Sequence, residues 1–265
     1  MAYLTDEDKE MFREEGYIVK SGLVASELME KARNVIWDNL DVDRNDPSTW
    51  IAGGKEGSQG MGGRSEFHAL IYDTPLFDVA EELAGKDRLA PLHGPITSAN
   101  FRFPQEGEWQ GPKGVHLDGH GVGGGIVNNW TVGISLYLND VIPQGGGTCV
   151  WPGTHKVMAE YFRTHSRVSL SRSFYELPIH AGDFRHVREV SNLDDAAYKE
   201  VSGPAGTVML WHSHLLHSAS MNCSRDIRMA IITRFRWTNW EDLKFEDPDD
   251  MWEYWEGMKE MEVVN

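Results

Sequence analysis

The sequence predicts a mainly β fold of the α+β class, in which N-terminal helices support a strand-rich core. Residues 1–90 combine helical spacing of apolar residues with recognisable helix caps. From residue 93 onward, short runs of β-branched and aromatic residues alternate with Gly and Pro turns, without helices between them, which favours a sandwich or barrel over a doubly wound sheet. We therefore expect one domain over residues 1–265, with a β core at 93–237 and a helical tail at 238–265.

Three N-terminal helices are expected from their end signals. The first starts at a Thr5 cap and ends at Gly16, a residue type that favours the left-handed conformation of a helix end. The second follows Ser26, where apolar residues recur at helical spacing. The third opens at Thr74-Pro75, because proline suits the first turn of a helix. These helices form the support over residues 1–90.

The β core is read from five runs that suit half-buried or buried strands. They are ITSANFRF (96–103), NNWTVGISLYL (128–138), GTCVW (147–151), GTVMLW (206–211) and MAIITRFRW (229–237). The glycine-rich loop at 51–67 suits a lid over a site, and the tail at 247–262 is expected to form an acidic surface helix.

Composition excludes several classes of function. The formal net charge is −16 and the sequence pI is near 5.1, so we expect no nucleic acid and no anionic membrane among the partners. No signal peptide and no apolar run long enough to span a membrane is recognised. Cys149 and Cys223 make no disulfide framework. We expect a cytoplasmic protein.

A glycine-rich stretch, GHGVGG at 119–124, formally matches the dinucleotide-binding pattern GxGxxG. That pattern binds a pyrophosphate only where a strand precedes it and a helix follows it. Residues 126–138 read as a strand instead, so a turn leaving a neighbouring site is the better interpretation.

That neighbouring site is the pair His116 and Asp118, which stand two positions apart in GVHLD. On a strand, residues at this spacing point to the same face. An imidazole and a carboxylate on one face, joined by a third ligand, would make the facial triad of non-haem Fe(II) oxygenases. The pair alone is a weak signal, because an ordinary polar strand residue also fits position 116.

The third ligand has three candidates in GTVMLWHSHLLHSASMNCSRDIR: His212, His214 and His217. Both His214 and His217 have an arginine eleven residues later, Arg225 and Arg228, so the spacing alone is ambiguous. Context favours His217, because Arg228 begins the apolar run of a strand that would hold it rigidly and aim it inward. A fixed guanidinium is suited to bidentate binding of a carboxylate.

Several motifs now stand in order, and together they resemble the phytanoyl-CoA dioxygenase (PhyH) family of Fe(II)/2-oxoglutarate-dependent oxygenases. They are GVHLD, WTVGISLYL, GGGTCVWPGTHK and the His217 segment, preceded by an N-terminal stretch that is similar to the family's opening helix and first strand. The resemblance covers roughly residues 3–236. It implies a double-stranded β-helix core (jelly roll, cupin-like) and an enzyme that uses Fe(II), 2-oxoglutarate and dioxygen.

The resemblance also assigns roles to individual residues. It implies that the catalytic metal ligands are His116, Asp118 and His217, and that Arg228 pairs with the distal carboxylate of 2-oxoglutarate. Three further residues are expected in the co-substrate pocket: Trp130, Ser218 and Asn100. The alanine at position 219 departs from the pattern, where the family can supply a hydroxyl.

Four other residues are candidates for contact with the substrate: His120, Trp151, His155 and Trp237. Each has a structural alternative. His120 suits a solvated turn, and the HxDxH spacing also suits a hydrolytic zinc site. His155, in PGTHK, suits a supporting role, and the two tryptophans suit core or rim packing.

The resulting interpretation is an oxygenase that hydroxylates, desaturates or cyclises an unactivated C–H position of a small molecule and releases succinate and carbon dioxide. Related halogenases replace the aspartate by Gly or Ala, and Asp118 therefore argues against halogenation. The aromatic content favours a partly apolar substrate of specialised metabolism, and we expect a monomer or homodimer. The rival hypotheses are a zinc hydrolase and a β-helix binding module that has lost its chemistry.

Overall fold

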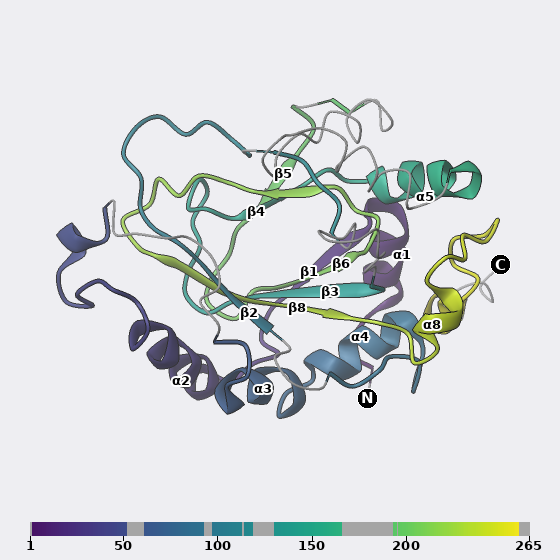
Figure 1. Cartoon of the computed structure of the whole chain (residues 1–265), viewed down its shortest axis with the longest axis horizontal. Coiled ribbons are helices and arrows are strands. Elements are labelled where there is room, and N and C mark those ends of the chain that lie inside the picture. The colour runs from purple at the N-terminus through teal and green to yellow at the C-terminus, as the bar shows by residue number, and fades with distance from the viewer. Residues whose placement is uncertain are drawn as a thin grey trace.

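Two antiparallel sheets face each other in this computed structural model, with helices against the larger sheet (Figure 1). The structure describes residues 2–51, 61–92, 97–112, 114–118, 130–165, 193–194 and 196–259. Most of the lid expected at residues 51–67 lies outside the described residues. In the described part of the chain, no helix combines the length and the apolar character needed to cross a membrane.

The larger sheet has five strands in the order β1-β6-β3-β8-β2. Their bounds are β1 Tyr17–Lys20, β2 Thr97–Arg102, β3 Val132–Tyr137, β6 Val208–His212 and β8 Arg228–Phe235. The smaller sheet has the order β5-β4-β7, with β4 Thr148–Val150, β5 Lys199–Val201 and β7 His217–Ala219. All five strands expected in the core are present. β5 and β7 were not expected, because Lys199–Val201 and His217–Ala219 are short and carry polar residues instead of an apolar run.

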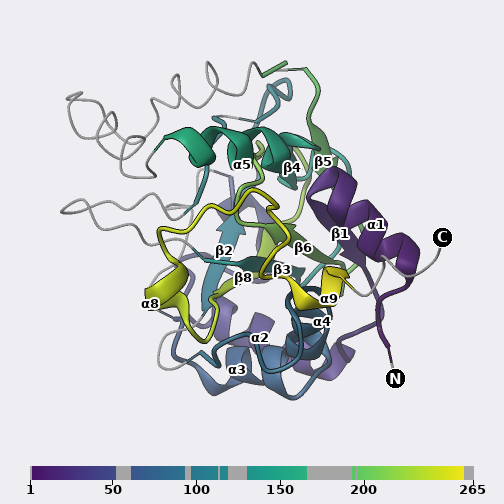
Figure 2. The same cartoon turned by 90° about the vertical axis from the view of Figure 1, so that its right-hand side faces the viewer.

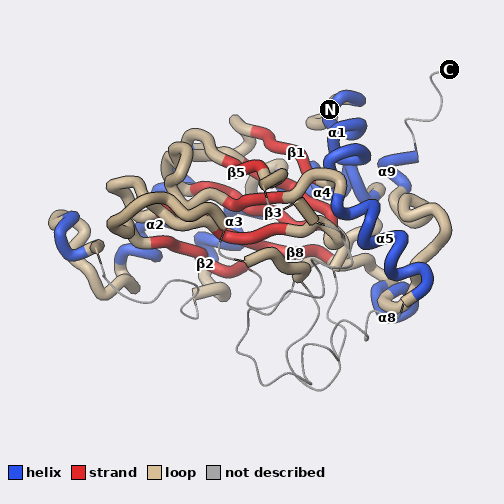
Figure 3. Tube along the Cα trace, turned by 90° about the horizontal axis from the view of Figure 1, so that it is seen from above, coloured by secondary structure: helices blue, strands red, loops and turns tan. Residues whose placement is uncertain are grey.

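The described helices gather outside the sheets. They are α1 Asp6–Glu15, α2 Ser26–Trp37, α3 Ser65–Tyr72, α4 Leu76–Ala84, α5 Thr154–Thr164, α8 Trp240–Leu243 and α9 Glu256–Lys259, with a 3-10 turn at Pro47–Thr49. Seen from above, α1, α5 and α9 lie at one end of the strands and α2 at the other (Figure 3). The expected end signals operate at α1, where Thr5 and Asp8 form a capping box and Gly16 ends the helix at φ +81°.

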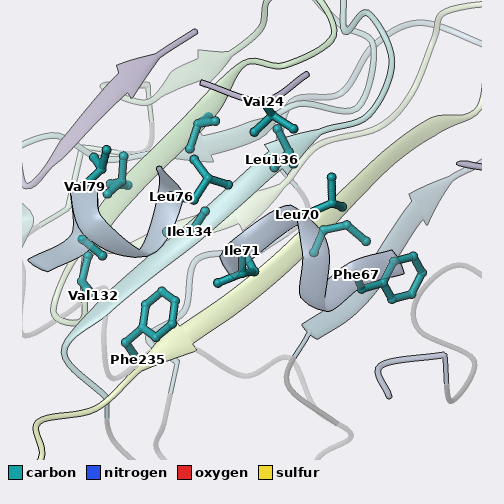
Figure 4. Packing of buried hydrophobic residues seen from close by; sticks show 14 of the residues in the cluster. Val24, Phe67, Leu70, Ile71, Leu76, Val79, Val132, Ile134, Leu136 and Phe235 are labelled. Carbon is teal, nitrogen blue, oxygen red and sulfur yellow. The ribbon is translucent and has the colours of Figure 1, made fainter. Parts of the chain in front are cut away.

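One face of the larger sheet is covered by α3 and α4. Leu70, Ile71 and Leu76 from these helices pack over Ile134 and Leu136 of β3, and all five side chains are fully buried (Figure 4). Since side chains alternate along a strand, the opposite face of β3 points toward the smaller sheet. The helices therefore close one side of the sheet and leave the space between the two sheets for a site.

The C-terminal tail does not form the acidic surface helix that was expected. Within the described residues its helical part is limited to α9, which lies beside α4 (Figure 2). Trp252, Trp255 and Met258 are buried in the main core, where both tryptophan rings pack against Phe12. Burial of these large apolar side chains outweighs the charge pattern that suggested an exposed helix.

Candidate metal centre and co-substrate cavity

A backbone bridge brings His116 and His217 together. The His116 N–H donates to the His217 carbonyl at 3.0 Å, and the His217 N–H donates to the His116 carbonyl at 3.2 Å. His217 is the first residue of β7, whereas His116 lies in an extended segment outside the named strands. The two imidazole centroids are 4.4 Å apart. Two distant parts of the sequence thus place their rings side by side.

Asp118 completes a cluster that fits a divalent metal ion. One ligand atom from each of the three side chains lies within 4.8 Å of the other two. The distance from Asp118 Oδ1 to His116 Nε2 is 3.6 Å, and from Asp118 Oδ2 to His217 Nε2 it is 3.2 Å. Two atoms that bind one ion at about 2.1 Å and at right angles lie roughly 3.0 Å apart. The three donors are therefore spaced as neighbouring ligands of a single ion.

The hydrogen bond of the His217 ring also indicates a metal-binding cluster. Its Nδ1 lies 2.9 Å from the Leu215 carbonyl oxygen, which can only accept, so Nδ1 carries the proton. In the neutral ring, Nε2 then presents a lone pair toward Asp118 Oδ2. Nε2 is thus the nitrogen left to bind a cation, and it lies 3.2 Å from Asp118 Oδ2, the spacing of two neighbouring ligands on one ion. The donor set is thus suited to a metal.

Electrostatics keeps the cluster in its ligating state. Burial lowers the pKa of His116 to about 4, so that this imidazole is neutral at pH 7 and free to donate its lone pair. Burial alone would raise the pKa of Asp118, but His217 and Arg234 together lower it below its ordinary value. The site therefore offers two imidazoles and one carboxylate.

Arg234 is a site residue that the sequence interpretation missed. Its Nε donates to Asp118 Oδ2 at 2.7 Å, and its Nη2 donates to the same oxygen. Its guanidinium lies beside the rings of Trp130 and Trp211, at 5.8 and 5.9 Å from their centroids. Strand periodicity could have identified Arg234 as a site residue. It follows Arg228 by an even number of positions, six, and therefore shares its face of β8.

A cavity of about 170 Å³ lies between the sheets and joins the metal cluster to the expected co-substrate residues. Its lining includes His116, His217, Asn100, Ser218, Arg228 and Arg234. Ser218 accepts a hydrogen bond from the Gly114 N–H at 3.2 Å, which ties β7 to the segment that carries the first two ligands. The structure thus brings five of the expected site residues into one space: His116, His217, Asn100, Ser218 and Arg228.

Arg228 is held rigidly in this cavity. Its side chain is buried, its Nε donates to the Gly146 carbonyl at 2.8 Å, and its Nη1 donates to Asn100 Oδ1 at 2.6 Å. Asn100 lies on β2, which pairs with β8. Arg225, the rival arginine, lies exposed in a turn. A buried cation fixed by neutral partners is a preorganised binding site for an anion.

The three tryptophans expected at the site lie outside the lining of this cavity. Trp130 and Trp237 line a second pocket of about 60 Å³ instead. Trp151 belongs to a separate apolar cluster with Val115 and Leu117, the residues on either side of His116. Trp130 contacts Arg234 and Trp211, which line the cavity, and Trp151 packs in the cluster that holds the residues beside His116. Trp130 and Trp151 therefore contact residues of the site and do not line the cavity themselves.

The other candidate histidines within the described residues are not brought into the cluster. His155 is fully buried and its Nε2 donates to the Arg13 carbonyl at 3.0 Å, beneath α1. His212 stacks on Trp255, and its Nδ1 accepts the His214 backbone N–H at 3.0 Å. His120, the remaining candidate, lies outside the described residues. Among the rival ligands, only His217 joins His116 and Asp118.

Comparison with known proteins agrees with this geometry. The model of the phytanoyl-CoA dioxygenase (PhyH) family matches residues 12–230. EctD from S. alaskensis, solved with 2-oxoglutarate and 5-hydroxyectoine, is 20% identical, with a TM-score of 0.59 over 88% of this chain and 76% of that chain. HygX from Streptomyces hygroscopicus, solved with nickel and 2-oxoglutarate, is 17% identical, with a TM-score of 0.55 over 89% and 88%.

A third solved structure, the α-ketoglutarate-dependent carbocyclase SnoK from nogalamycin biosynthesis, is 17% identical, with a TM-score of 0.54 over 88% of this chain and 84% of that chain. Comparison with the curated proteins gave no match. The three likenesses confirm the jelly-roll fold class that the sequence predicted.

Proposed function

Because this chain belongs to the phytanoyl-CoA dioxygenase (PhyH) family of iron- and 2-oxoglutarate-dependent oxygenases, we propose that it oxidises an unactivated C–H bond of a small organic molecule. The enzyme class and the two cofactors follow from the family. The observation that carries the proposal is the convergence of His116, Asp118 and His217 at the edge of a cavity that also contains a buried arginine, Arg228.

The three donors of this chain would hold the iron on one face and leave the opposite positions for co-substrate and oxygen. When bound, iron with 2-oxoglutarate and dioxygen supplies the oxidising power that breaks the C–H bond, with release of succinate and carbon dioxide. The protein keeps His116 neutral and Asp118 ionised, and the Leu215 carbonyl fixes the ring orientation of His217.

Arg228 is proposed to bind the distal carboxylate of 2-oxoglutarate. It lines the same cavity as both histidine ligands, and the Asn100 amide oxygen and the Gly146 carbonyl hold its fork in place. Ser218 adds a hydroxyl to the same wall. Since these groups need not move to receive the anion, little ordering entropy is lost on binding.

Asp118 narrows the class of reaction. As a third protein ligand, its carboxylate would take the place that a halide would need on the ion. We therefore propose hydroxylation, desaturation or cyclisation as the outcome. The substrate is proposed to be a partly apolar small molecule, because the second pocket beside Arg234 is lined by Trp130, Trp237 and further aromatic residues.

A turnover screen tests this proposal. The protein is supplied with Fe(II), ascorbate and 2-oxoglutarate and is challenged with small-molecule libraries, while succinate is quantified. The expected result is succinate release with a product that has gained one oxygen or lost two hydrogens by mass. A zinc hydrolase would give neither, and a binding module without chemistry would give no succinate with any compound that it binds.

The cytoplasmic location, the organisation as a single domain and the monomeric or homodimeric state stay predictions from the sequence. Size-exclusion chromatography with light scattering would determine the last of these directly.

A further inference from the structure

Strand β8 presents two arginines to one cavity. Arg228 and Arg234 share a strand face, and both line the space that contains the histidine ligands. Arg234 follows Arg228 by six positions, so their Cα atoms lie roughly 20 Å apart along the strand. Arg234 contacts Asp118, whereas Arg228 is held by Asn100 at the other end of the strand. The metal cluster thus has one guanidinium beside it and another at a distance.

The Arg234 guanidinium points at Asp118, and only some of its N–H donors have hydrogen-bond partners within the described residues. Its Nε and Nη2 both donate to Asp118 Oδ2, and Nη1 has no hydrogen-bond partner within the described part of the chain. The rings of Trp130 and Trp211 pack against each other and lie together on one side of the guanidinium, which restricts the directions in which it can turn. About a third of its side chain is exposed. A guanidinium carries five N–H donors, so donors remain beside a metal-ligand oxygen.

The position of these donors identifies what they would bind. An oxygen that binds the ion next to Asp118 would lie roughly 3.0 Å from an Asp118 oxygen, by the spacing of neighbouring ligands used above. A guanidinium already in contact with Asp118 Oδ2 is within reach of such an oxygen, because its fork spans two acceptors side by side. A carboxylate bound at the metal would therefore meet Arg234.

We infer that Arg234 binds the carboxylate of the co-substrate that lies nearest the metal, while Arg228 binds the distal one. The inference rests on the proposed function, since it takes 2-oxoglutarate as the dicarboxylate. It assigns the co-substrate a cation at each end of one cavity, in a protein whose overall charge is −16. The competing explanation is that Arg234 only holds Asp118 and does not touch the co-substrate.

Binding of two oxo acids to the manganese(II)-loaded protein separates these explanations. 2-Oxoglutarate has both carboxylates, whereas 2-oxobutyrate lacks the distal one. Isothermal titration calorimetry without oxygen measures affinity without turnover, at manganese concentrations that saturate each variant. We expect Arg234→Gln to weaken both ligands by about ten- to a hundredfold, the usual effect of losing a charged hydrogen bond.

The matched control is Arg228→Lys, on the same strand and the same face. It keeps the buried charge and loses the fork, so it should weaken 2-oxoglutarate by about tenfold and leave 2-oxobutyrate unchanged. Arg234→Lys should weaken both ligands to an intermediate degree. It also provides the decisive comparison if Arg234→Gln folds poorly, which circular dichroism would show.

Each outcome decides the inference. Unchanged affinity of the Arg234 variants for both ligands would overturn it and leave Arg234 as a partner of Asp118 alone. Loss of 2-oxoglutarate binding with 2-oxobutyrate unaffected would also overturn it, because that pattern belongs to a distal contact. If the manganese-loaded native protein bound neither oxo acid, the proposed function would fail first, and the two failures are thereby distinguished.

Discussion

Asp118 and Arg234 form a direct ion pair inside the metal cluster, with the guanidinium Nε 2.7 Å from the carboxylate Oδ2. The same carboxylate lies 3.2 Å from the Nε2 of His217. A single acid group therefore faces the Arg234 guanidinium on one side and the His217 imidazole on the other. This arrangement keeps Asp118 ionised although it is largely removed from water.

Removal of that acid should abolish catalysis. We expect Asp118→Ala to lose 2-oxoglutarate turnover, because two imidazoles alone hold the ion weakly and leave the Arg234 charge unpaired. Succinate release is the measurement. Asp41→Ala, at an exposed position, is the control and should behave as the native protein does. Normal product formation by Asp118→Ala without added carboxylate would refute the ligand assignment.

A divalent metal should stabilise the folded protein. The donor atoms of His116, Asp118 and His217 lie within 4.8 Å of one another, so a bound cation joins groups that the unfolded chain does not hold together. An ion present at a hundred times its dissociation constant contributes about 2.7 kcal/mol. We expect manganese(II) to raise the unfolding midpoint in calorimetry and a chelator to reverse the rise. An equal rise in His217→Ala would contradict binding at this cluster.

Asn100 should affect the binding of 2-oxoglutarate by holding Arg228 in place. We expect Asn100→Ala to raise the KM for 2-oxoglutarate several-fold with a smaller change in kcat, because Arg228 loses its 2.6 Å partner and the fork is less well ordered. The loss of one hydrogen bond to a charged group corresponds to about 1.5–3 kcal/mol at most. Metal affinity, measured separately, should not change. A fall in kcat alone would show that Asn100 has another role.

Two glycines provide a matched test of packing. Gly16 and Gly22 both have positive φ, +81° and +77°, but a Cβ at Gly16 would lie 2.5 Å from the His155 ring, whereas at Gly22 nothing lies within 4 Å. Gly22→Ala should cost about 1–2 kcal/mol for the left-handed backbone alone. Gly16→Ala should cost about 1–3 kcal/mol more, for the steric overlap. Urea unfolding measures both, and equal losses would contradict the contact.

His155 should make the protein sensitive to acid. Burial lowers its pKa to about 4, whereas the ordinary value of 6.5 applies to the unfolded chain. Between pH 6.5 and pH 4 the His155 ring binds a proton in the unfolded chain but not in the folded protein. The contribution of His155 to the free energy of unfolding is therefore fully present above pH 6.5 and is lost as the pH falls through this range. The maximum loss is about 3 kcal/mol.

The measurement is the free energy of unfolding as a function of pH, compared between the native protein and His155→Gln. Both proteins retain the other histidines and the carboxylates, so their contributions cancel in the difference. We expect a shallower loss for the variant below pH 6.5. Parallel curves would show that His155 does not titrate in this range.

Signals that depend on neighbouring residues in the chain predicted much of the fold. The capping box at Thr5 and the glycine at position 16 act within one helix end, and the apolar run that begins after Arg228 acts within one strand. Such signals depend on near neighbours in the chain, and the structure confirms the elements that they predicted. The ligand pair His116 and Asp118 belongs to the same class, since its spacing lies within three residues.

The packing of the C-terminal tail and the position of Trp130 could not be predicted from such local signals. The charge pattern of the tail indicated an exposed helix, but Trp252 and Trp255 are buried against Phe12 from the other end of the chain. Trp130 was expected in the co-substrate pocket and instead lines a second pocket beside Arg234. Each of these positions depends on which distant segment packs against the residue.

The sequence by itself predicted the types of element, because periodicity and caps are local properties, and its resemblance to the PhyH family assigned the three candidate ligands and the arginine Arg228. Only the tertiary structure decided that His116 bridges His217, that Arg234 reaches Asp118, and that His155 lies beneath a helix. Those relations arise from the pairing of strands and segments far apart in the chain. Burial and hydrogen bonding select that pairing, and no local pattern encodes it.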